Sequence, residues 1–327
     1  MSRRVEFHAE TWPLKEPFQI SRGVRTEVTV TVAEIREGAC KGRGESVPYA
    51  HYGENAESVI AALKGVEKNI ELGCSRADLL GLLPAGAARN ALDCALWDLE
   101  AKLAGRTAFD MSGAEAARDP NTALTIGIDT ADRMAVKAAL LKDCKLLKVK
   151  VDRDQVVEKI RRIREEAPSP RMIVDPNESW DFELLKQVHE DLANLRVDML
   201  EQPLPAGKDE ELQGFVSAVP LCADESCHTR ADLPRLKGRY DIINIKLDKT
   251  GGLTEAIALK NQAESMGFRI MIGCMIGTSL SMAPALLLAE GAEFLDLDGP
   301  VWMERDRDGG LNIDFGAISP PSAEFWG

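Results

Sequence analysis

The sequence predicts an α/β protein in which a (β/α)8 barrel follows a smaller α+β part. From about residue 120, short apolar runs start roughly 20–27 residues apart, and each is followed by a helical segment, so eight strand–helix units are available to close a barrel. The first third has a different pattern, with alternating β-branched residues and two apolar helical faces. A chain of 327 residues can bury both cores without disulfides or a structural metal.

The composition excludes several classes of partner. The net charge of −13, from 53 acidic and 40 basic residues, repels phosphate backbones and anionic lipid. No apolar run reaches the ~18 residues of a spanning helix, and the charged N-terminus is not followed by the apolar core of a signal peptide. Seven cysteines, an odd number spread over the chain, suit reduced thiols. We expect a cytoplasmic protein without nucleic-acid or membrane partners.

The first part should begin with a small sheet. Residues 28–35 alternate β-branched with other side chains and are expected to form a strand that pairs with residues 4–10. Gly38, Gly42 and Gly44 follow closely and are expected to mark turns.

Two helices should complete this part. Residues 58–72 carry apolar side chains at helical spacing, and Gly73 is expected to end that helix. A second helix should begin near Pro84, present one apolar face and end at Gly105.

The barrel should occupy most of the remaining chain. We expect its strands at residues 123–128, 146–151, 172–175, 197–201, 221–224, 242–247, 269–273 and 293–297. The expected domains are residues 1–118, then 119–300 for the barrel, and a segment at 301–327 that runs back over the first domain.

Polar residues end most of these strands, and in a barrel the carboxyl ends of all strands meet at one face. In chain order the residues are Lys148 and Lys150, Asp175, Glu201, Asp224, Lys246, and Asp296 with Asp298. Asp175, Glu201 and Asp224 are separated from one another in turn by one strand–helix unit, so they should come from neighbouring strands. This face of the barrel is therefore the expected active site.

Three carboxylates on adjacent strands, Asp175, Glu201 and Asp224, would repel one another unless a cation lay between them. Carboxylate oxygens that leave positions open for water and substrate are typical Mg²⁺ ligands. Taken singly, each acid could equally be a surface residue or the partner of a neighbouring lysine, but the matched positions favour the metal.

Three lysines at the mouth also need an explanation. Lys148 and Lys150 are two residues apart, so they point to the same side of their strand, and Lys246 lies four strands further round and faces them. Near a metal and partly desolvated, such a lysine is expected to have a lowered pKa and to act as a base near neutral pH. The simpler alternative is that these lysines form ion pairs with the acids, and such pairing in the free enzyme does not exclude catalysis.

Five motifs in register carry a family resemblance. They are Lys148–Lys150, Val174–Trp180, Glu201–Pro203, Cys222–Ser226 and Asn244–Gly252. The chain resembles the enolase superfamily and, within it, the muconate-lactonizing subgroup, which implies a modified (β/α)8 TIM barrel with an α+β capping domain completed by the C-terminal segment.

The resemblance extends to the bacterial dipeptide epimerases that act on L-Ala-D/L-Glu in murein peptide metabolism. It implies one Mg²⁺ per subunit and a 1,1-proton transfer through an enediolate, with Lys150 and Lys246 as the two bases and Lys148 assisting them. It also allows a homo-oligomer. The implied substrate contacts are Asp296 and Asp298 with the α-ammonium, Arg25 rather than Arg22 with the side-chain carboxylate, and Thr125, Cys274 and Met275 as lining.

Two alternatives remain beside this interpretation. Muconate cycloisomerase, o-succinylbenzoate synthase and N-acylamino-acid racemase would share the metal ligands and lysines, although Asp296 and Asp298 would repel an anionic or acylated substrate. A catalytically silent barrel that serves as a binding protein is the alternative of a different class.

Other residues whose side chains can bind metals or substrate give weaker indications of a site. Cys222, Cys227 and His228 lack a fourth ligand and the spacing of a zinc site. His51 lies in a loop that either shapes the pocket or is solvated. Trp180 is expected to pack beneath the metal loop.

Overall fold

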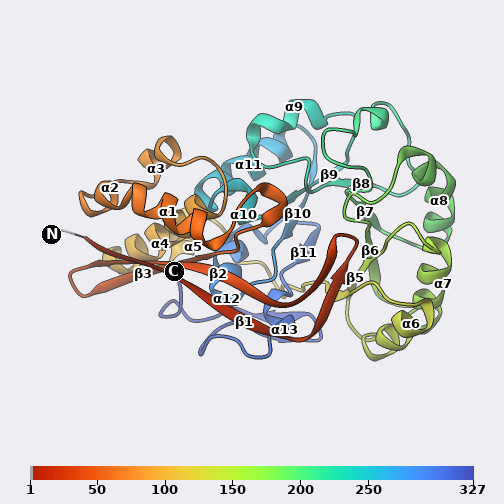
Figure 1. The fold of residues 1–327 in the computed structure, drawn as a ribbon, viewed down its shortest axis with the longest axis horizontal. Helices are drawn as coiled ribbons and strands as arrows, with labels where there is room; N and C mark the ends of the chain where they lie inside the picture. Colours follow the sequence, from red (N-terminus) through yellow and green to blue (C-terminus); the bar gives the residue numbers. More distant parts are fainter. Residues whose placement is uncertain (1–2) are drawn as a thin grey trace.

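A three-stranded antiparallel sheet opens the chain, in order β1 (Arg4–Ile20), β2 (Gly23–Glu37) and β3 (Cys40–Ser46). The computed structural model describes residues 3–327. Helices then follow at η1 (Ala50–Tyr52), α1 (Ala56–Gly65), α2 (Glu67–Glu71), α3 (Arg76–Leu82), α4 (Ala87–Ala104) and α5 (Ala108–Ser112). In Figure 1 this part forms the red and orange side of the molecule, and the β1–β2 hairpin reaches from it toward the barrel.

The expected pairing of residues 28–35 with 4–10 is confirmed, because Val5 lies opposite Ile35 and Glu10 opposite Val30. The helix expected at 58–72 is instead two helices, α1 and α2, separated at Val66. Glycine and β-branched valine are poor helix formers, and the sequence places them together at 65–66.

The expectation that Gly42 and Gly44 mark turns is wrong. Both lie inside β3, where the strand passes against α4 at backbone distance. A Cβ on Gly44 would lie 2.1 Å from the Ala91 carbonyl oxygen, and one on Gly42 would lie 2.2 Å from that of Ala95. These glycines are therefore required for close packing of strand on helix. The expected end of α4 at Gly105 is confirmed, with φ 61°.

Eight parallel strands form the second part, in sequential order from β4 to β11. Their bounds are β4 (Leu124–Ile126), β5 (Leu146–Lys150), β6 (Arg171–Asp175), β7 (Met199–Glu201), β8 (Leu221–Ala223), β9 (Ile242–Ile245), β10 (Arg269–Gly273) and β11 (Phe294–Asp296). All eight expected strands are present, most of them slightly shorter than expected. The parallel bridge Thr122–Leu295, just before β4, joins the first strand to the last, so the barrel is nearly closed.

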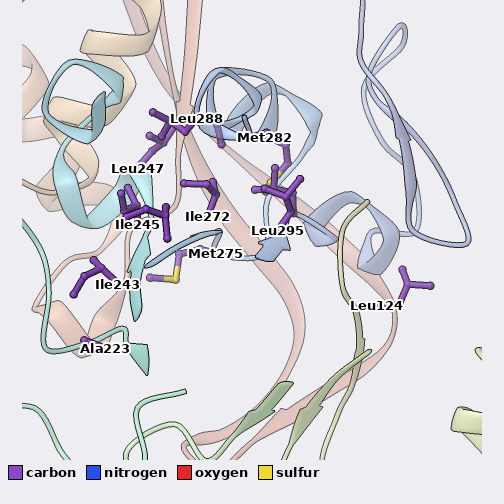
Figure 2. Close-up of a cluster of buried hydrophobic side chains, with 14 of the residues drawn as sticks. Leu124, Ala223, Ile243, Ile245, Leu247, Ile272, Met275, Met282, Leu288 and Leu295 are labelled. Carbon is purple, nitrogen blue, oxygen red and sulfur yellow. The ribbon is translucent and has the colours of Figure 1, made fainter. Parts of the chain in front are cut away.

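Helices surround this barrel between and after the strands. They are α6 (Ala131–Leu140), α7 (Val156–Glu166), α8 (Phe182–Asn194), η2 (Glu210–Leu212), η3 (Arg230–Asp232), α9 (Leu233–Leu236), α10 (Leu247–Thr250), α11 (Leu253–Ser265), α12 (Ser279–Ala285), η4 (Leu286–Leu288) and α13 (Gly299–Trp302). Figure 2 shows Ile272 and Leu295, from β10 and β11, packed with Met282 and Leu288 of α12 and η4. No helix within residues 3–327 is long and apolar enough to cross a membrane.

The inside of the barrel holds a separate apolar layer to which each strand segment contributes one residue. The residues are Ala123, Leu146, Ile173, Met199, Cys222, Ile242, Met271 and Phe294. This layer fills the amino-terminal half of the barrel interior, as expected for a closed barrel of this size. The inward-facing residues nearer the carboxyl ends of the strands lie directly above this layer.

Hydrogen bonds of α4 connect the first part to the barrel and to the chain end. Arg89 of α4 donates hydrogen bonds to the carbonyl oxygens of Thr250 and Gly251, at 2.7 and 3.0 Å. The chain end also returns to α4, where Trp326 donates to the carbonyl oxygen of Cys94. Before that return it forms a short hairpin, β12 (Asn312–Asp314) and β13 (Ala317–Ser319), which the sequence did not predict.

Candidate active site

The polar side chains at the barrel mouth follow from the period of two in a β-strand. On β5, Leu146 belongs to the inner apolar layer, so Lys148 and Lys150 also point inward, one and two steps closer to the mouth. A spacing of two residues relates Ile173 to Asp175, Met199 to Glu201, Cys222 to Asp224 and Phe294 to Asp296, and a spacing of four, twice the period, relates Ile242 to Lys246. One rule therefore brings residues from six strands to one place.

A pocket of about 70 Å³ opens at this mouth, and most of the residues expected in the site line it. They are Arg25, Thr125, Lys148, Lys150, Asp224, Lys246, Cys274, Met275, Asp296 and Asp298. The remaining two, Asp175 and Glu201, are fully buried and contact Lys148 from the barrel side. The structure thus brings all of the expected site residues together.

Lys148 lies at the centre of an acidic cluster. Its ammonium is 2.7 Å from Asp296, 2.8 Å from Glu201 and 3.2 Å from Asp175. Burial opposes the charge, but these carboxylates outweigh burial and raise the pKa of Lys148. Burial together with the charge of Asp175 raises the pKa of Glu201 to about 7.

The two expected bases are also ion-paired. Lys150 Nζ lies 2.5 Å from Asp175 Oδ2, and Lys246 Nζ lies 2.8 Å from Asp224 Oδ2. Asp224 outweighs burial and raises the pKa of Lys246, whereas the lowered pKa is expected for a lysine beside a metal ion. The ion-paired alternative is what the structure shows. β5 and β9 are four positions apart in the eight-stranded sheet, so Lys150 and Lys246 approach the pocket from opposite sides.

The carboxylates suit a hard divalent cation. Within residues 3–327 no three acidic, histidine or cysteine side chains are already gathered as a metal site, and lysines lie against the carboxylates instead. Glu201 Oε2 and Asp224 Oδ1 are buried, and each faces a lysine ammonium, Lys148 at 2.8 Å and Lys249 at 2.7 Å, which a cation would have to displace. Such oxygens on neighbouring strands β7 and β8, with Asp175 on β6, provide the donors that Mg²⁺ prefers. The residues therefore fit the metal.

Three further buried residues complete the cluster and were not singled out from the sequence. Lys249 contacts Asp224 Oδ1 at 2.7 Å, and Asn244 donates to Glu201 Oε1 at 2.9 Å. Glu225 points one unpartnered oxygen into buried space, and burial together with Asp224 raises its pKa to about 8. The period of two, counted from Ile242, would have identified Asn244. Lys249 lies in the short helix α10 and Glu225 in the loop after β8, so the period of a strand identifies neither.

The expected ammonium site lies at the end of β11. Asp298 Oδ2 accepts a hydrogen bond from the Thr125 backbone N–H at 2.8 Å, which ties β4 to this loop. Asp296 keeps one oxygen, Oδ1, buried without a hydrogen bond. Burial and the neighbouring Asp296 charge raise the pKa of Asp298 to about 6. Two adjacent acids with spare oxygens can accept hydrogen bonds from an ammonium.

The two candidate arginines occupy different environments. Arg22 pairs with Glu225 at 2.8 Å and with Glu178 at 3.0 Å. Arg25 lines the same pocket and stacks on the Tyr49 ring, with 4.8 Å between the guanidinium carbon and the ring centroid. Arg25 is therefore the guanidinium that faces the pocket without a carboxylate partner among the described ion pairs.

Cys222, His228 and Trp180, the candidates set aside in the sequence analysis, make packing and hydrogen-bond contacts. Cys222 belongs to the inner barrel layer, and all seven cysteines are free. His228 packs edge-on against Tyr52, and burial lowers its pKa to about 4. Trp180 is buried, as expected, and donates to the Asp152 carbonyl oxygen.

Comparison with known families agrees with this geometry. Residues 2–113 match the mandelate racemase / muconate lactonizing enzyme N-terminal domain, and residues 129–323 match the enolase C-terminal domain-like family. The chain belongs to the enolase superfamily. The resemblance drawn from the five motifs is thereby confirmed, as is the expected fold of a barrel with a separate N-terminal sheet domain.

Relatives within this superfamily are epimerases and racemases, which are isomerases. The chain is 48% identical to L-Ala-D/L-Glu epimerase of Escherichia coli K12, over 97% of this chain and 99% of the relative. It is 45% identical to N-acetyl-D-glutamate racemase of a Pseudoalteromonas species, over 90% of this chain and 94% of the relative. The enzyme class expected from the sequence agrees with both names.

Solved structures add bound ligands in relatives. An enolase family member from Agrobacterium tumefaciens with homology to dipeptide epimerases, with bound sodium and L-Ala-L-Glu, superposes with a TM-score of 0.96 at 45% identity, over 99% of this chain and all of that one. A Methylococcus capsulatus dipeptide epimerase complexed with Mg and L-Arg-D-Lys has a TM-score of 0.90 at 32% identity, with 98% of each chain covered. Relatives of this fold therefore bind Mg and dipeptides.

Proposed function

We propose that this chain is a Mg²⁺-dependent epimerase of L-Ala-D/L-Glu dipeptides that inverts the α-carbon of the C-terminal residue. The observation that carries the proposal is the placement of Lys150 and Lys246 on strands four positions apart, with acidic strand ends between them. An amine on each side of one carbon can remove a proton from one face and return it to the other. The names and bound dipeptides of the relatives support the same activity.

Asp175, Glu201 and Asp224 would hold the metal. Mg²⁺, when bound there, supplies positive charge beside the substrate carboxylate, where negative charge develops as the α-proton leaves. Lys148, buried among the same acids, adds a fixed positive charge at that place.

The two bases have separate tasks. We assign Lys150 to the α-proton of the L epimer and Lys246 to that of the D epimer. Each is ion-paired here, to Asp175 and Asp224 respectively, so the lysine that acts as base has to leave its carboxylate and lose a proton before it can accept the α-proton. The lysine on the opposite face stays an ammonium and donates its proton to the other face of the carbon, which inverts the centre and leaves that lysine neutral.

Substrate contacts come from both parts of the chain. Asp296 and Asp298 would accept hydrogen bonds from the α-ammonium, and Arg25 would bind the side-chain carboxylate of the glutamate residue. Thr125 holds Asp298 in place through its backbone N–H. Cys274 and Met275 line the pocket at the end of β10.

The test is an assay of the purified protein with MgCl₂ and either L-Ala-L-Glu or L-Ala-D-Glu, followed by chromatographic separation of the epimers. The expected result is interconversion to the same mixture from both sides, abolished by EDTA and restored by Mg²⁺. Absence of interconversion, or interconversion that survives metal removal, would contradict the proposal.

Racemisation of N-acetylglutamate is a second candidate, favoured by the 45% identity to a racemase of that name. An N-acetyl group carries no charge and offers a single N–H donor, whereas an ammonium offers three donors and a positive charge. Asp296 and Asp298 therefore favour the free dipeptide. Comparing kcat/KM for L-Ala-D-Glu with that for N-acetyl-D-glutamate decides between the two.

We further propose that the enzyme acts in the cytoplasm on peptides from cell-wall turnover and assembles as a homo-oligomer. The acidic composition and free cysteines suit that compartment. The proposed domains are residues 1–118, 119–300 and 301–327, in support of which the chain end contacts α4.

A further inference from the structure

One carboxylate joins both loops of the first domain to the barrel. Glu178 lies in the loop after β6, and its Oε2 is 3.0 Å from Arg22 Nη1 and 2.7 Å from His51 Nε2. Its Oε1 accepts a hydrogen bond from the Ala206 backbone N–H at 2.7 Å, in the loop after β7. Arg22 comes from the tip of the β1–β2 hairpin and His51 from η1, so four segments meet at this side chain.

The backbone at this position is itself unusual. Asn177 and Glu178 have φ values of 46° and 66°, a left-handed conformation that side chains other than glycine rarely adopt. The Glu178 N–H donates to the Gln202 carbonyl oxygen at 2.9 Å, which fixes the turn. Strained residues of this kind persist where the surrounding structure holds them and cluster at functional sites.

The same contacts separate the roles of the two arginines. Arg22 also donates to Glu225, to the Tyr49 hydroxyl and to the Asn177 carbonyl oxygen, so both Nη atoms of its guanidinium are engaged within the protein. Tyr49, held by Arg22, forms with its ring the platform under Arg25. The position of Arg25 therefore depends on Arg22, which in turn depends on Glu178.

We propose that Glu178 is a positioning residue that fastens residues 20–25 and 49–52 onto the barrel and thereby orients Arg25 toward an acidic side chain of the substrate. This inference rests on the proposed dipeptide epimerase function. Both loops reach the pocket at the barrel mouth, which Arg22, Arg25, Tyr49 and Tyr52 help to line.

The test compares Glu178→Gln with wild type on L-Ala-D-Glu and on its uncharged analogue L-Ala-D-Gln, measured as KM or as an inhibition constant. Glu178→Gln keeps an acceptor for Ala206 but loses the charge facing Arg22 and His51. We expect KM for L-Ala-D-Glu to rise about 10-fold or more, as for loss of a charged hydrogen bond, while the constant for L-Ala-D-Gln changes much less and kcat is retained. An unchanged KM, or an equal rise for both dipeptides, would overturn the proposal.

Two further variants sharpen this result. Glu16→Gln removes the 3.0 Å pair with Lys137, which also joins the first domain to the barrel but is exposed, and it should leave both constants unchanged. Arg22→Gln should reproduce the Glu178→Gln effect, and the double variant should be no worse than either single one. Additive effects would place the two residues in separate roles and refute the coupling.

A measurement without substrate separates this inference from the proposed function. Hydrogen–deuterium exchange of the free protein should show faster uptake at residues 20–25 and 49–52 in Glu178→Gln than in wild type or Glu16→Gln. If wild type fails to epimerise L-Ala-D-Glu, the proposed function fails, yet faster uptake would still support the fastening. Unchanged uptake would overturn it.

Discussion

Asp248 should make the stability of this protein depend on pH in a way that one substitution removes. The residue lies two positions after Lys246, and its Oδ1 accepts hydrogen bonds from the Val47 backbone N–H at 2.9 Å and from Asn90 Nδ2 at 2.8 Å. It therefore connects the barrel to the loop after β3 and to α4. Burial, reinforced by the charge of Glu54, raises its pKa from 3.8 to about 7.

The sign follows from linkage. A carboxyl whose pKa is higher in the folded state binds protons more tightly there, so the protein loses stability as pH rises from about 4 to about 7. At 1.36 kcal/mol for each pH unit, the full cost above pH 7 is about 4 kcal/mol. Asp248→Asn keeps an oxygen for both donors and carries no charge. The free energy of unfolding of Asp248→Asn minus that of wild type should therefore increase by about 3 kcal/mol as the pH rises from 5 to 8.

The assay is urea denaturation of wild type and Asp248→Asn at pH values from 5 to 8, with the free energy of unfolding compared at each. Only the change of the difference with pH tests the reasoning, because any constant effect of the amide cancels. If the difference in free energy of unfolding between the two proteins does not change from pH 5 to pH 8, burial does not raise the pKa of Asp248 and the reasoning is refuted.

Other substitutions test the packing and the site. Gly44→Ala should lower the free energy of unfolding, measured by urea denaturation, by about 3 kcal/mol or more, because its Cβ would lie 2.1 Å from the Ala91 carbonyl oxygen. Gly65→Ala has open space around it and should be neutral or stabilising by up to ~1 kcal/mol. Equal effects of the two substitutions would contradict the close approach of β3 to α4. Glu201→Gln should weaken Mg²⁺ binding by about 10-fold or more in titration calorimetry, and an unchanged affinity would remove it from the metal site. Asp298→Asn should lower kcat/KM for L-Ala-D-Glu by about 10- to 100-fold and leave N-acetylglutamate little affected, and the reverse preference would favour the racemase.

The barrel and the core of its site could be predicted because both depend on short-range pattern. The period of two fixes that Asp175, Glu201 and Asp224 face inward whenever the residue two positions earlier does. The spacing of one strand–helix unit then places them side by side. Neither inference needs knowledge of how distant segments pack.

The features that escaped prediction depend on contacts between segments far apart in the chain. Gly42 and Gly44 resemble turn glycines in sequence, and only the approach of α4 explains them. Glu178 acquires its role from loops about 130 and 160 residues earlier, at His51 and Arg22. The raised pKa of Lys246 is a balance between burial and nearby carboxylates, whose sign cannot be read without distances.

The central claim is that two amines reach one carbon from opposite faces. Lys246→Ala, incubated in D₂O with Mg²⁺ and each epimer separately, tests it most directly by NMR of the α-position. We predict that wild type interconverts the epimers with deuterium incorporation, and that the variant stops interconversion but still exchanges the α-proton of L-Ala-L-Glu through Lys150. Exchange of both epimers by the variant, or wild-type epimerisation with the α-hydrogen fully retained as protium, would contradict it.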